Sequence, residues 1–314
     1  MRYLSDADVA RLLPPPLETI QLAHAALVAL ADGSAEVPPK PAVHPGGASF
    51  ANAMPAAYPA RKLLGCKWIS IFPDNGDRGL PAVTGLMVVN DGDTGEPRSV
   101  MAAGALTAAR TAAVSGACIA ALSAPDATVA ITGAGVQARS HLRVLAGLGR
   151  HRVTVFARRA EAREALVAWA AGAVPEVELE VSDDVAATVR DAEVVVTGLA
   201  IGLTGSTLDP DGLRPDVLLL PLDYASSVGG DLARSATLSS DHVEQFEAMR
   251  RAGSLGDYPS THLATGTLLA RPRPAGRVVC QNLGNALSDL MVAASVADAA
   301  EAQDAGHLLD TAPA

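Results

Sequence analysis

The stretch Ala127-Thr-Val-Ala-Ile-Thr-Gly-Ala-Gly-Val-Gln-Ala-Arg-Ser-His-Leu142 decides the fold. Its first part, Val129 to Thr132, is a short apolar run that predicts a buried strand. An apolar repeat from Leu142 to Leu148 predicts a helix after it. Between the two, Gly133-Ala-Gly-Val-Gln-Ala138 has the G-x-G-x-x-[GA] pattern of a dinucleotide-binding turn. The alternative is an incidental glycine turn, but strand and helix flank the motif in the required order.

Each small residue of this turn has a physical role. Gly133 permits the tight turn, Gly135 lets the backbone approach a pyrophosphate, and Ala138 lets the helix pack closely on the strand. The first backbone N–H groups of the helix are unpaired and carry partial positive charge, which suits phosphate. We therefore expect Gly133, Gly135, Val136 and Gln137 to bind the cofactor.

The residues after the next predicted strand, Val153 to Ala157, indicate which dinucleotide binds. An NAD-preferring site keeps an acidic residue there for the ribose 2′-hydroxyl, and this chain has Arg158 and Arg159 instead. Two guanidinium groups would bind a 2′-phosphate. The alternative is an ordinary charged helix start, although arginine is unfavourable at that end of the helix dipole. The pair favours NADP(H), with NAD(H) still possible.

The composition excludes several classes of protein. Of 314 residues, 49% are hydrophobic and 18% charged, which is typical of a globular chain of about two domains. The net charge of −10 disfavours nucleic acid. No signal-peptide core and no apolar run of membrane-spanning length is expected. Cys66, Cys118 and Cys280 are scattered without metal-ligand spacing, so we expect no metal and a reduced, cytoplasmic protein.

The order of predicted elements changes near residue 122. A proline-led helix ends near Gly33, a Pro/Gly-rich passage from Val37 forms an edge strand or a loop, and turns then join strands at 63–72, 83–90 and 97–101. After a helix over 106–122, strands and helices alternate, with strands at 129–132, 153–157, 177–181, 193–197, 217–222 and 277–281 and a loop over 198–215. A last helix starts at Asn285.

This order predicts an α/β protein with a Rossmann doubly wound parallel sheet and a second, mixed α+β domain. The Rossmann dinucleotide-binding domain is expected at 123–284. The substrate-binding and dimerisation domain is expected at 1–122, and the last helix, 285–314, would return to complete it.

Several blocks of the chain together resemble the ornithine cyclodeaminase/μ-crystallin family. They are Lys67-Trp-Ile-Ser-Ile-Phe-Pro73-Asp-Asn75, Gly79-Leu-Pro81, Asp93-Thr-Gly95-Glu-Pro97, Leu106-Thr-Ala-Ala-Arg110-Thr-Ala-Ala113, the glycine-rich turn and Leu283-Gly-Asn-Ala-Leu-Ser-Asp289. The resemblance covers most of the chain. It implies a homodimer whose N-terminal domain binds an amino or imino acid, with active sites in the cleft between domains.

The resemblance also implies roles for individual residues. It places Lys67 and Arg110 at the family's substrate-carboxylate positions and Lys40, by a loose alignment, at that of an early arginine. Without it, Lys67 and Arg110 would be expected at the surface. Asp223 follows a predicted parallel strand and matches the family's acid/base aspartate, although such a residue is often only a cap. We also expect Thr197, Leu199 and Asn282 to contact the cofactor.

Two departures from the family pattern bear on the substrate. Pro221-Leu222 replaces the usual small, Gly-rich lead-in to the aspartate, and Lys40 replaces the arginine, which argues against ornithine. The expected function is an NADP(H)-dependent oxidoreductase of the C–N bond, either an imine or ketimine reductase or an amino-acid dehydrogenase, in which Asp223 and Lys67 are catalytic. The alternatives are a cyclodeaminase that recycles NAD and a ligand-binding protein that retains NADPH.

Overall fold

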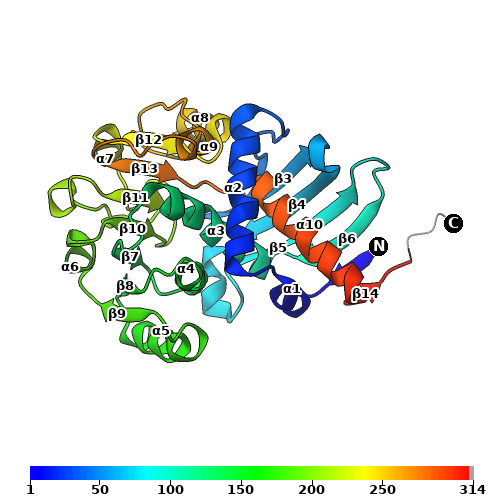
Figure 1. Ribbon diagram of the computed structural model, residues 1–314, viewed down its shortest axis with the longest axis horizontal. Coiled ribbons are helices and arrows are strands. Elements are labelled where there is room, and N and C mark those ends of the chain that lie inside the picture. Colours follow the sequence, from blue (N-terminus) through cyan, green and yellow to red (C-terminus); the bar gives the residue numbers. More distant parts are fainter. Residues whose placement is uncertain (311–314) are drawn as a thin grey trace. The chain divides into compact units, whose positions relative to one another are not determined.

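A computed structural model describes residues 1–310, which form two compact units (Figure 1). The first unit comprises Met1–Arg110 and the C-terminal segment from Asn285, and the second comprises Thr111–Gly284. The first border lies inside helix α3 (Gly104–Leu122), whereas the sequence analysis placed it after that helix. A helix that continues through a border shows no break in its periodicity, so the sequence pattern gives no sign of the border.

The first unit is built on a mixed sheet of seven strands in the order β14-β1-β6-β5-β4-β3-β2. Neighbouring strands are antiparallel, except for the parallel pair of β1 and β6. The strands are β1 (Arg2–Leu4), β2 (Ala42–Gly46), β3 (Ser49–Tyr58), β4 (Leu63–Ile71), β5 (Val83–Asp91), β6 (Pro97–Ala102) and β14 (His307–Leu308). The proline-rich passage thus supplies an edge strand, β2, as one of the two predicted alternatives.

The first unit also contains the start of α3 and three whole helices: α1 (Asp6–Leu12), α2 (Pro16–Asp32) and α10 (Ala286–Ala302). Helix α10 packs on β3, β4, β5 and α2, so the last helix lies on the N-terminal sheet (Figure 1). The contact is close, because a Cβ added at Gly65 of β4 would lie 2.7 Å from Leu290 Cδ1. Met54, Ile69 and Met87 belong to the core beneath these helices.

Strand β3 was not predicted from the sequence, because Pro55 and several alanines interrupt its pattern. The strand pairs along its whole length with β4, from Phe50 to Tyr58, but β2 reaches only as far as Asn52. Pro55 therefore lies beyond the end of β2, where a missing N–H removes no ladder hydrogen bond to that strand. Proline is tolerated at this position for that reason.

The second unit contains a parallel sheet of seven strands in the order β12-β13-β11-β10-β7-β8-β9, which confirms the predicted doubly wound fold. The strands are β7 (Val129–Thr132), β8 (Arg152–Phe156), β9 (Glu178–Ser182), β10 (Val194–Thr197), β11 (Leu218–Pro221), β12 (Thr237–Ser240) and β13 (Val278–Gln281). From β7 the chain first proceeds to β8 and β9, and β10 then returns to the other side of β7. The order in which strands are added to the sheet thus reverses between β7 and β10, and doubly wound sheets bind ligands at such a point.

The helices of the second unit are α4 (Val136–Gly147), α5 (Ala160–Ala173), α6 (Val185–Arg190), α7 (Gly230–Arg234), α8 (Val243–Arg251) and α9 (Thr265–Leu269). Short 3-10 helices are η1 (Pro59–Arg61) and η2 (Pro73–Arg78) in the first unit and η3 (Pro210–Gly212) in the second. The predicted loop over 198–215 is irregular apart from η3.

Helix α3 corrects the expectation that no segment has the length and composition of a membrane span. It has 19 residues, and its most apolar window has a mean hydropathy of 1.5, enough to cross a membrane by length and composition alone. In the structure 67% of that window is buried, which is typical of a core helix. Its many alanines explain the difference, because they raise hydropathy and also let a helix pack closely in an interior.

Candidate active site

The glycine-rich turn has the geometry that a dinucleotide requires. Gly133 has φ +97°, and a Cβ added there would lie 2.7 Å from the carbonyl oxygen of Gly198, so the position accepts only glycine without strain. A Cβ at Gly135 would meet no described atom within 4 Å, so this residue faces open space. Gly135 is the N-cap of α4, and Ala138 is buried. The turn and the N-terminus of α4 therefore fit a bound pyrophosphate.

The loop after β8 presents Arg158 and Arg159 to solvent. Neither side chain forms an ion pair with a residue in the described part of the chain. A third arginine, Arg163, contacts the backbone of this loop, and no sequence pattern predicted that contact. Arg163 Nη1 donates to the carbonyl oxygens of Ala157, at 2.6 Å, and Arg158, at 3.0 Å. These hydrogen bonds stabilise the backbone of a loop that carries two exposed guanidinium groups.

Asp223 lies just beyond β11 and is 1% exposed. Three groups donate hydrogen bonds to its carboxylate: Thr197 Oγ1 to Oδ1 at 2.8 Å, Ser227 Oγ to Oδ2 at 2.6 Å, and the backbone N–H of Leu199 to Oδ2 at 3.2 Å. Thr197 and Leu199, expected at the cofactor, thus contact the aspartate. Ser227 was not singled out from the sequence, because a serine four residues after an aspartate carries no recognisable signal.

The segment that donates to Asp223 also lies against the glycine-rich turn. Leu199, which donates to the carboxylate, directly follows Gly198. The carbonyl oxygen of Gly198 is so near Gly133 that a Cβ added at Gly133 would lie 2.7 Å from it. Burial raises the pKa of Asp223 above its usual value, although the three donors oppose this effect by stabilising the charged form. The next residue, Tyr224, has φ +59°, a strained conformation that is common at functional sites.

Hydrogen bonds join the carboxyl ends of β11 and β13, next to the segment that carries Asp223. Gln281 Nε2 donates to the carbonyl oxygens of Pro221 (3.4 Å) and Tyr224 (3.5 Å). Asn282, a predicted cofactor residue, donates from its backbone N–H to Pro221 O at 3.2 Å and from Nδ2 to Thr111 O at 3.3 Å. Asn282 is 5% exposed and stabilises the segment that carries Asp223.

Lys67 and Arg110 meet on one carboxylate in the interior of the first unit. Lys67 Nζ lies 2.7 Å from Asp289 Oδ2, and Arg110 Nε donates to Asp289 Oδ1 at 2.8 Å. Their side chains are 1% and 6% exposed and that of Asp289 is fully buried, so neither cation has the surface position expected without the resemblance. Asp289 ends the block Leu283–Asp289 that resembles the family, but nothing in its sequence context predicts its role. We call these three residues the buried charge cluster.

Burial has a large effect on Lys67. Desolvation and, after it, repulsion by Arg110 lower the pKa of Lys67 to about 7, although Asp289 opposes both effects. Lys40, which is half-buried and precedes β2, also acts on Lys67 as a positive charge. Lys40 is therefore close enough to Lys67 to act on its charge, and its place in a substrate-binding set with Arg110 stays a prediction.

The buried charge cluster has two cations and one anion. Arg110 Nη1 is buried and has no hydrogen-bond partner among residues 1–310. A buried guanidinium nitrogen without a partner is costly, and a carboxylate is the group that satisfies it best. The cluster can therefore accept one more carboxylate.

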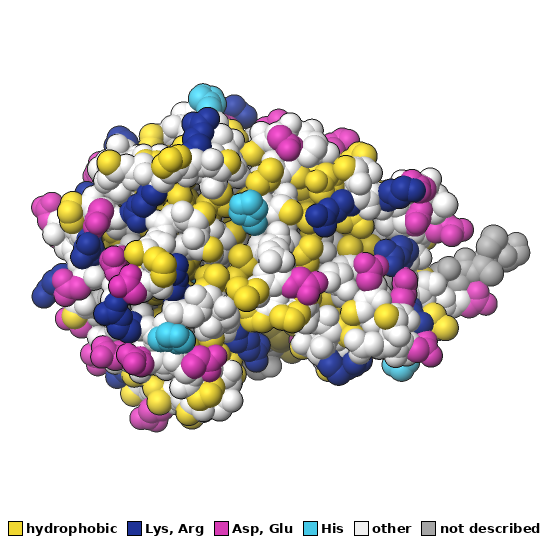
Figure 2. All heavy atoms as spheres, in the orientation of Figure 1, with side chains coloured by type: hydrophobic (Ala, Val, Ile, Leu, Met, Phe, Trp, Pro, Cys, Tyr) yellow, Lys and Arg dark blue, Asp and Glu magenta, His cyan; other side chains and the backbone are white. Residues whose placement is uncertain are grey.

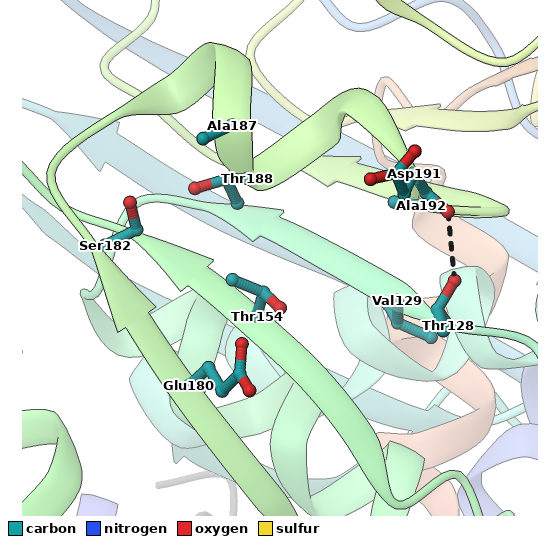
Figure 3. A pocket seen from close by; sticks show the side chains of 9 residues that line it. All are labelled: Thr128, Val129, Thr154, Glu180, Ser182, Ala187, Thr188, Asp191 and Ala192. Atoms are coloured by element: carbon teal, nitrogen blue, oxygen red, sulfur yellow. Dashed lines mark hydrogen bonds between the residues drawn. The ribbon is translucent and has the colours of Figure 1, made fainter.

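A cavity of about 350 Å³ lies elsewhere in the second unit, between α6 and strands β7, β8 and β9 (Figure 3). Its walls carry hydroxyl groups such as that of Thr188 and the carboxylates of Glu180 and Asp191, and none of its lining residues is a predicted site residue. On the face of the molecule in Figure 2, Lys and Arg side chains are interspersed with Asp and Glu. Neither feature relates to the predicted chemistry.

Comparisons with known proteins show a family, relatives in sequence and a similar fold. A sequence model of the ornithine cyclodeaminase/mu-crystallin family matches residues 4–303. The nodulation efficiency protein NfeD of Rhizobium meliloti is 30% identical over 98% of both chains. The Δ1-pyrroline-2-carboxylate reductase of Paracoccus denitrificans is 28% identical over 74% of this chain and 78% of its own. The solved structure of the Thermococcus litoralis Δ1-pyrroline-2-carboxylate reductase with NADH and L-proline has a TM-score of 0.86 at 21% identity, covering 98% of this chain and 100% of its own.

Proposed function

The chain belongs to the ornithine cyclodeaminase/mu-crystallin family, and we propose that it is an NADP(H)-dependent oxidoreductase acting on the C–N bond of an amino or imino acid. The observation that carries the proposal is the position of Asp223. This buried carboxyl group stands at the carboxyl edge of the parallel sheet, and Leu199 and Gly198 link it to the dinucleotide-binding turn at Gly133. An acid/base group beside a nicotinamide site is what C–N oxidoreduction requires.

We assign the reductive direction and separate roles to the residues. A reduced nicotinamide, when bound, supplies hydride to the C=N carbon. Asp223 gives a proton to the substrate nitrogen, and its raised pKa keeps the carboxyl group protonated at higher pH than an ordinary aspartate. Lys67 and Arg110 bind the substrate carboxylate, with Lys40 adding positive charge nearby. The buried charge cluster supports these roles, because it lacks one carboxylate.

The preference for NADP(H) is part of the proposal. Arg158 and Arg159 are exposed directly after β8, where an NAD enzyme keeps an acidic residue for the 2′-hydroxyl. Arg163 donates to the carbonyl oxygens of Ala157 and Arg158 and so stabilises the backbone that carries the two exposed guanidinium groups. Gly133, Gly135, Val136 and Gln137 would bind the pyrophosphate in either cofactor.

A homodimer is also proposed, and the outer face of the mixed sheet supports it. Trp68 and Leu86 are cross-strand partners on β4 and β5, each 46% exposed, and Leu64 on the same face of β4 is 39% exposed. Contiguous exposed apolar side chains on a sheet face mark an interaction surface. We propose that a second copy of the chain covers them. A cytoplasmic location is proposed with it, because Cys66, Cys118 and Cys280 are free thiols.

The test is a substrate panel in which the loss of NADPH absorbance is followed. The panel contains Δ1-pyrroline-2-carboxylate, its six-membered homologue, and 2-oxo acids with ammonium. We expect turnover of at least one cyclic or acyclic imine, and Asp223→Asn should reduce kcat by about 100- to 10,000-fold with NADPH affinity near that of the parent, because the amide keeps the shape but cannot transfer the proton.

Other results of the same panel would contradict the proposal. Ammonia release from ornithine without net change in the cofactor would indicate a cyclodeaminase. NADPH binding without turnover of any substrate would indicate a ligand-binding protein. Turnover of Asp223→Asn within a few-fold of the parent would show that another group donates the proton.

A further inference from the structure

We propose that Asp289 is a positioning residue of the carboxylate-binding site: it holds Lys67 and Arg110 side by side and leaves Arg110 Nη1 for the substrate carboxylate. The identity of the bound carboxylate rests on the proposed function. The arrangement of the three side chains does not, because all of them belong to the first unit.

The position of Asp289 is set by backbone packing. It lies in the first turn of α10, which Asn285 caps by accepting a hydrogen bond from Ser288 N at 2.8 Å. The helix approaches β4 so closely that Gly65 has no room for a Cβ beside Leu290. Lys67 is on the same strand as Gly65, and its side chain also faces α10. Helix and strand together therefore fix where the carboxylate of Asp289 meets the ammonium group.

The two oxygens of Asp289 are divided between the two cations. Oδ2 lies beside Lys67 Nζ, and Oδ1 accepts from Nε of Arg110. Because Asp289 uses Nε, the guanidinium is held in place while Nη1 stays without a partner in the described chain. The planar fork of arginine can bind a second carboxylate in this way, whereas lysine could not.

Asp289 also sets the charge of Lys67. The groups that act on Lys67 include Arg110 from α3 and Lys40 from the segment before β2, both positive, and Asp289 from α10 is the anion that opposes them. Its cross-strand neighbours, Met54 on β3 and Met87 on β5, are apolar. Without the negative charge, a buried ammonium facing two cations loses its proton. The negative charge of Asp289 thus keeps Lys67 protonated, and only a protonated Lys67 can bind the negatively charged carboxylate of the substrate.

The chain offers an unusually direct test, because it contains only three lysines, Lys40, Lys62 and Lys67. Protein with isotope-labelled lysine side chains gives three resonances that can be followed by NMR across pH, and Lys67→Arg assigns that of Lys67. In the parent, Lys67 should titrate near its pKa of about 7. In Asp289→Asn its midpoint should fall by about one to three pH units.

A matched control is available on the same turn of the helix. Ser288 is buried, and its hydroxyl has no hydrogen-bond partner among the described residues, so Ser288→Ala perturbs α10 without touching the cluster. Its Lys67 midpoint should equal that of the parent. Lys62, which is exposed and paired with Asp93, serves as an internal reference in every sample. An unchanged Lys67 midpoint in Asp289→Asn would overturn the proposal, because a merely structural role would not move it.

A second measurement separates this proposal from the proposed function. For the best substrate of the panel, Asp289→Asn should raise KM by about tenfold or more, with a smaller change in kcat. If the parent binds no amino or imino acid, the proposed function fails, but the lysine titration still decides the role of Asp289.

A second variant keeps the proposal testable if Asp289→Asn does not fold. Asp289→Glu retains the charge but displaces it by one methylene. Its Lys67 midpoint should stay within about one pH unit of the parent, while KM rises because the two cations are displaced. A KM of this variant equal to that of the parent would show that Asp289 has no positioning role. A Lys67 midpoint in this variant more than about one pH unit below that of the parent would also overturn the proposal.

Discussion

Removing the Ser227 hydroxyl should shift the pH dependence of the reaction to higher pH. Ser227 Oγ is fully buried and donates to Asp223 Oδ2 at 2.6 Å, one of three donors that stabilise the carboxylate. A hydrogen bond to a charged group contributes about 1.5–3 kcal/mol, and one pKa unit corresponds to about 1.4 kcal/mol. Ser227→Ala should therefore raise the pKa of Asp223 by a further one to two units, approximately.

The direction of the effect follows from which form the reaction uses. The donors favour the charged form, so losing one favours the protonated acid. In the reductive direction the acid is the active form, and the alkaline limb of kcat/KM should move to higher pH. In the oxidative direction the carboxylate is the active form, and the acidic limb should move to higher pH as well. Both limbs are measured with the best imine and its amino-acid product.

The neighbouring serine provides the control. Ser226 Oγ accepts a hydrogen bond from Gly202 N at 2.9 Å and is not among the three donors to Asp223, so Ser226→Ala should leave both limbs in place. Limbs that stay at the parent's pH in Ser227→Ala, or that move to lower pH, would refute the reasoning. Either result would mean that Asp223 is not the titrating group.

Three further predictions concern the fold, the cofactor and the dimer. Gly133→Ala should lower the free energy of unfolding in urea by about 1–3 kcal/mol, since φ is +97° and Gly198 O blocks the Cβ. A Cβ at Gly135 meets open space, so Gly135→Ala should keep the parent's free energy of unfolding but lose NADPH binding. Arg158→Ala should weaken NADPH binding by about tenfold or more in a fluorescence titration and leave NADH binding unchanged; tighter NADH binding by the parent would overturn the cofactor assignment. Leu86→Asp should convert a dimer to monomers in analytical ultracentrifugation, and a monomeric parent would contradict the dimer.

The sequence alone determined the features that depend on local patterns. Alternating strands and helices after residue 122 predicted the doubly wound sheet, and the spacing from Gly133 to Ala138 predicted the turn between β7 and α4. A polar residue after an apolar run located Asp223 at the end of β11. These predictions succeed because turn chemistry, strand length and helical periodicity are all set by residues close together in the chain.

Only the tertiary structure decided which charges meet. Arg110 and Asp289 are 179 positions apart, and no periodicity connects them. Lys67 looks like a surface lysine at a strand, and it is buried only because α10 returns across β4 and supplies a carboxylate there. The position of Ser227 against Asp223 likewise depends on how the loop after β11 folds back. The physical reason is that the free energy of a buried charge depends on neighbours that chain topology brings together, and a linear pattern contains no record of that topology.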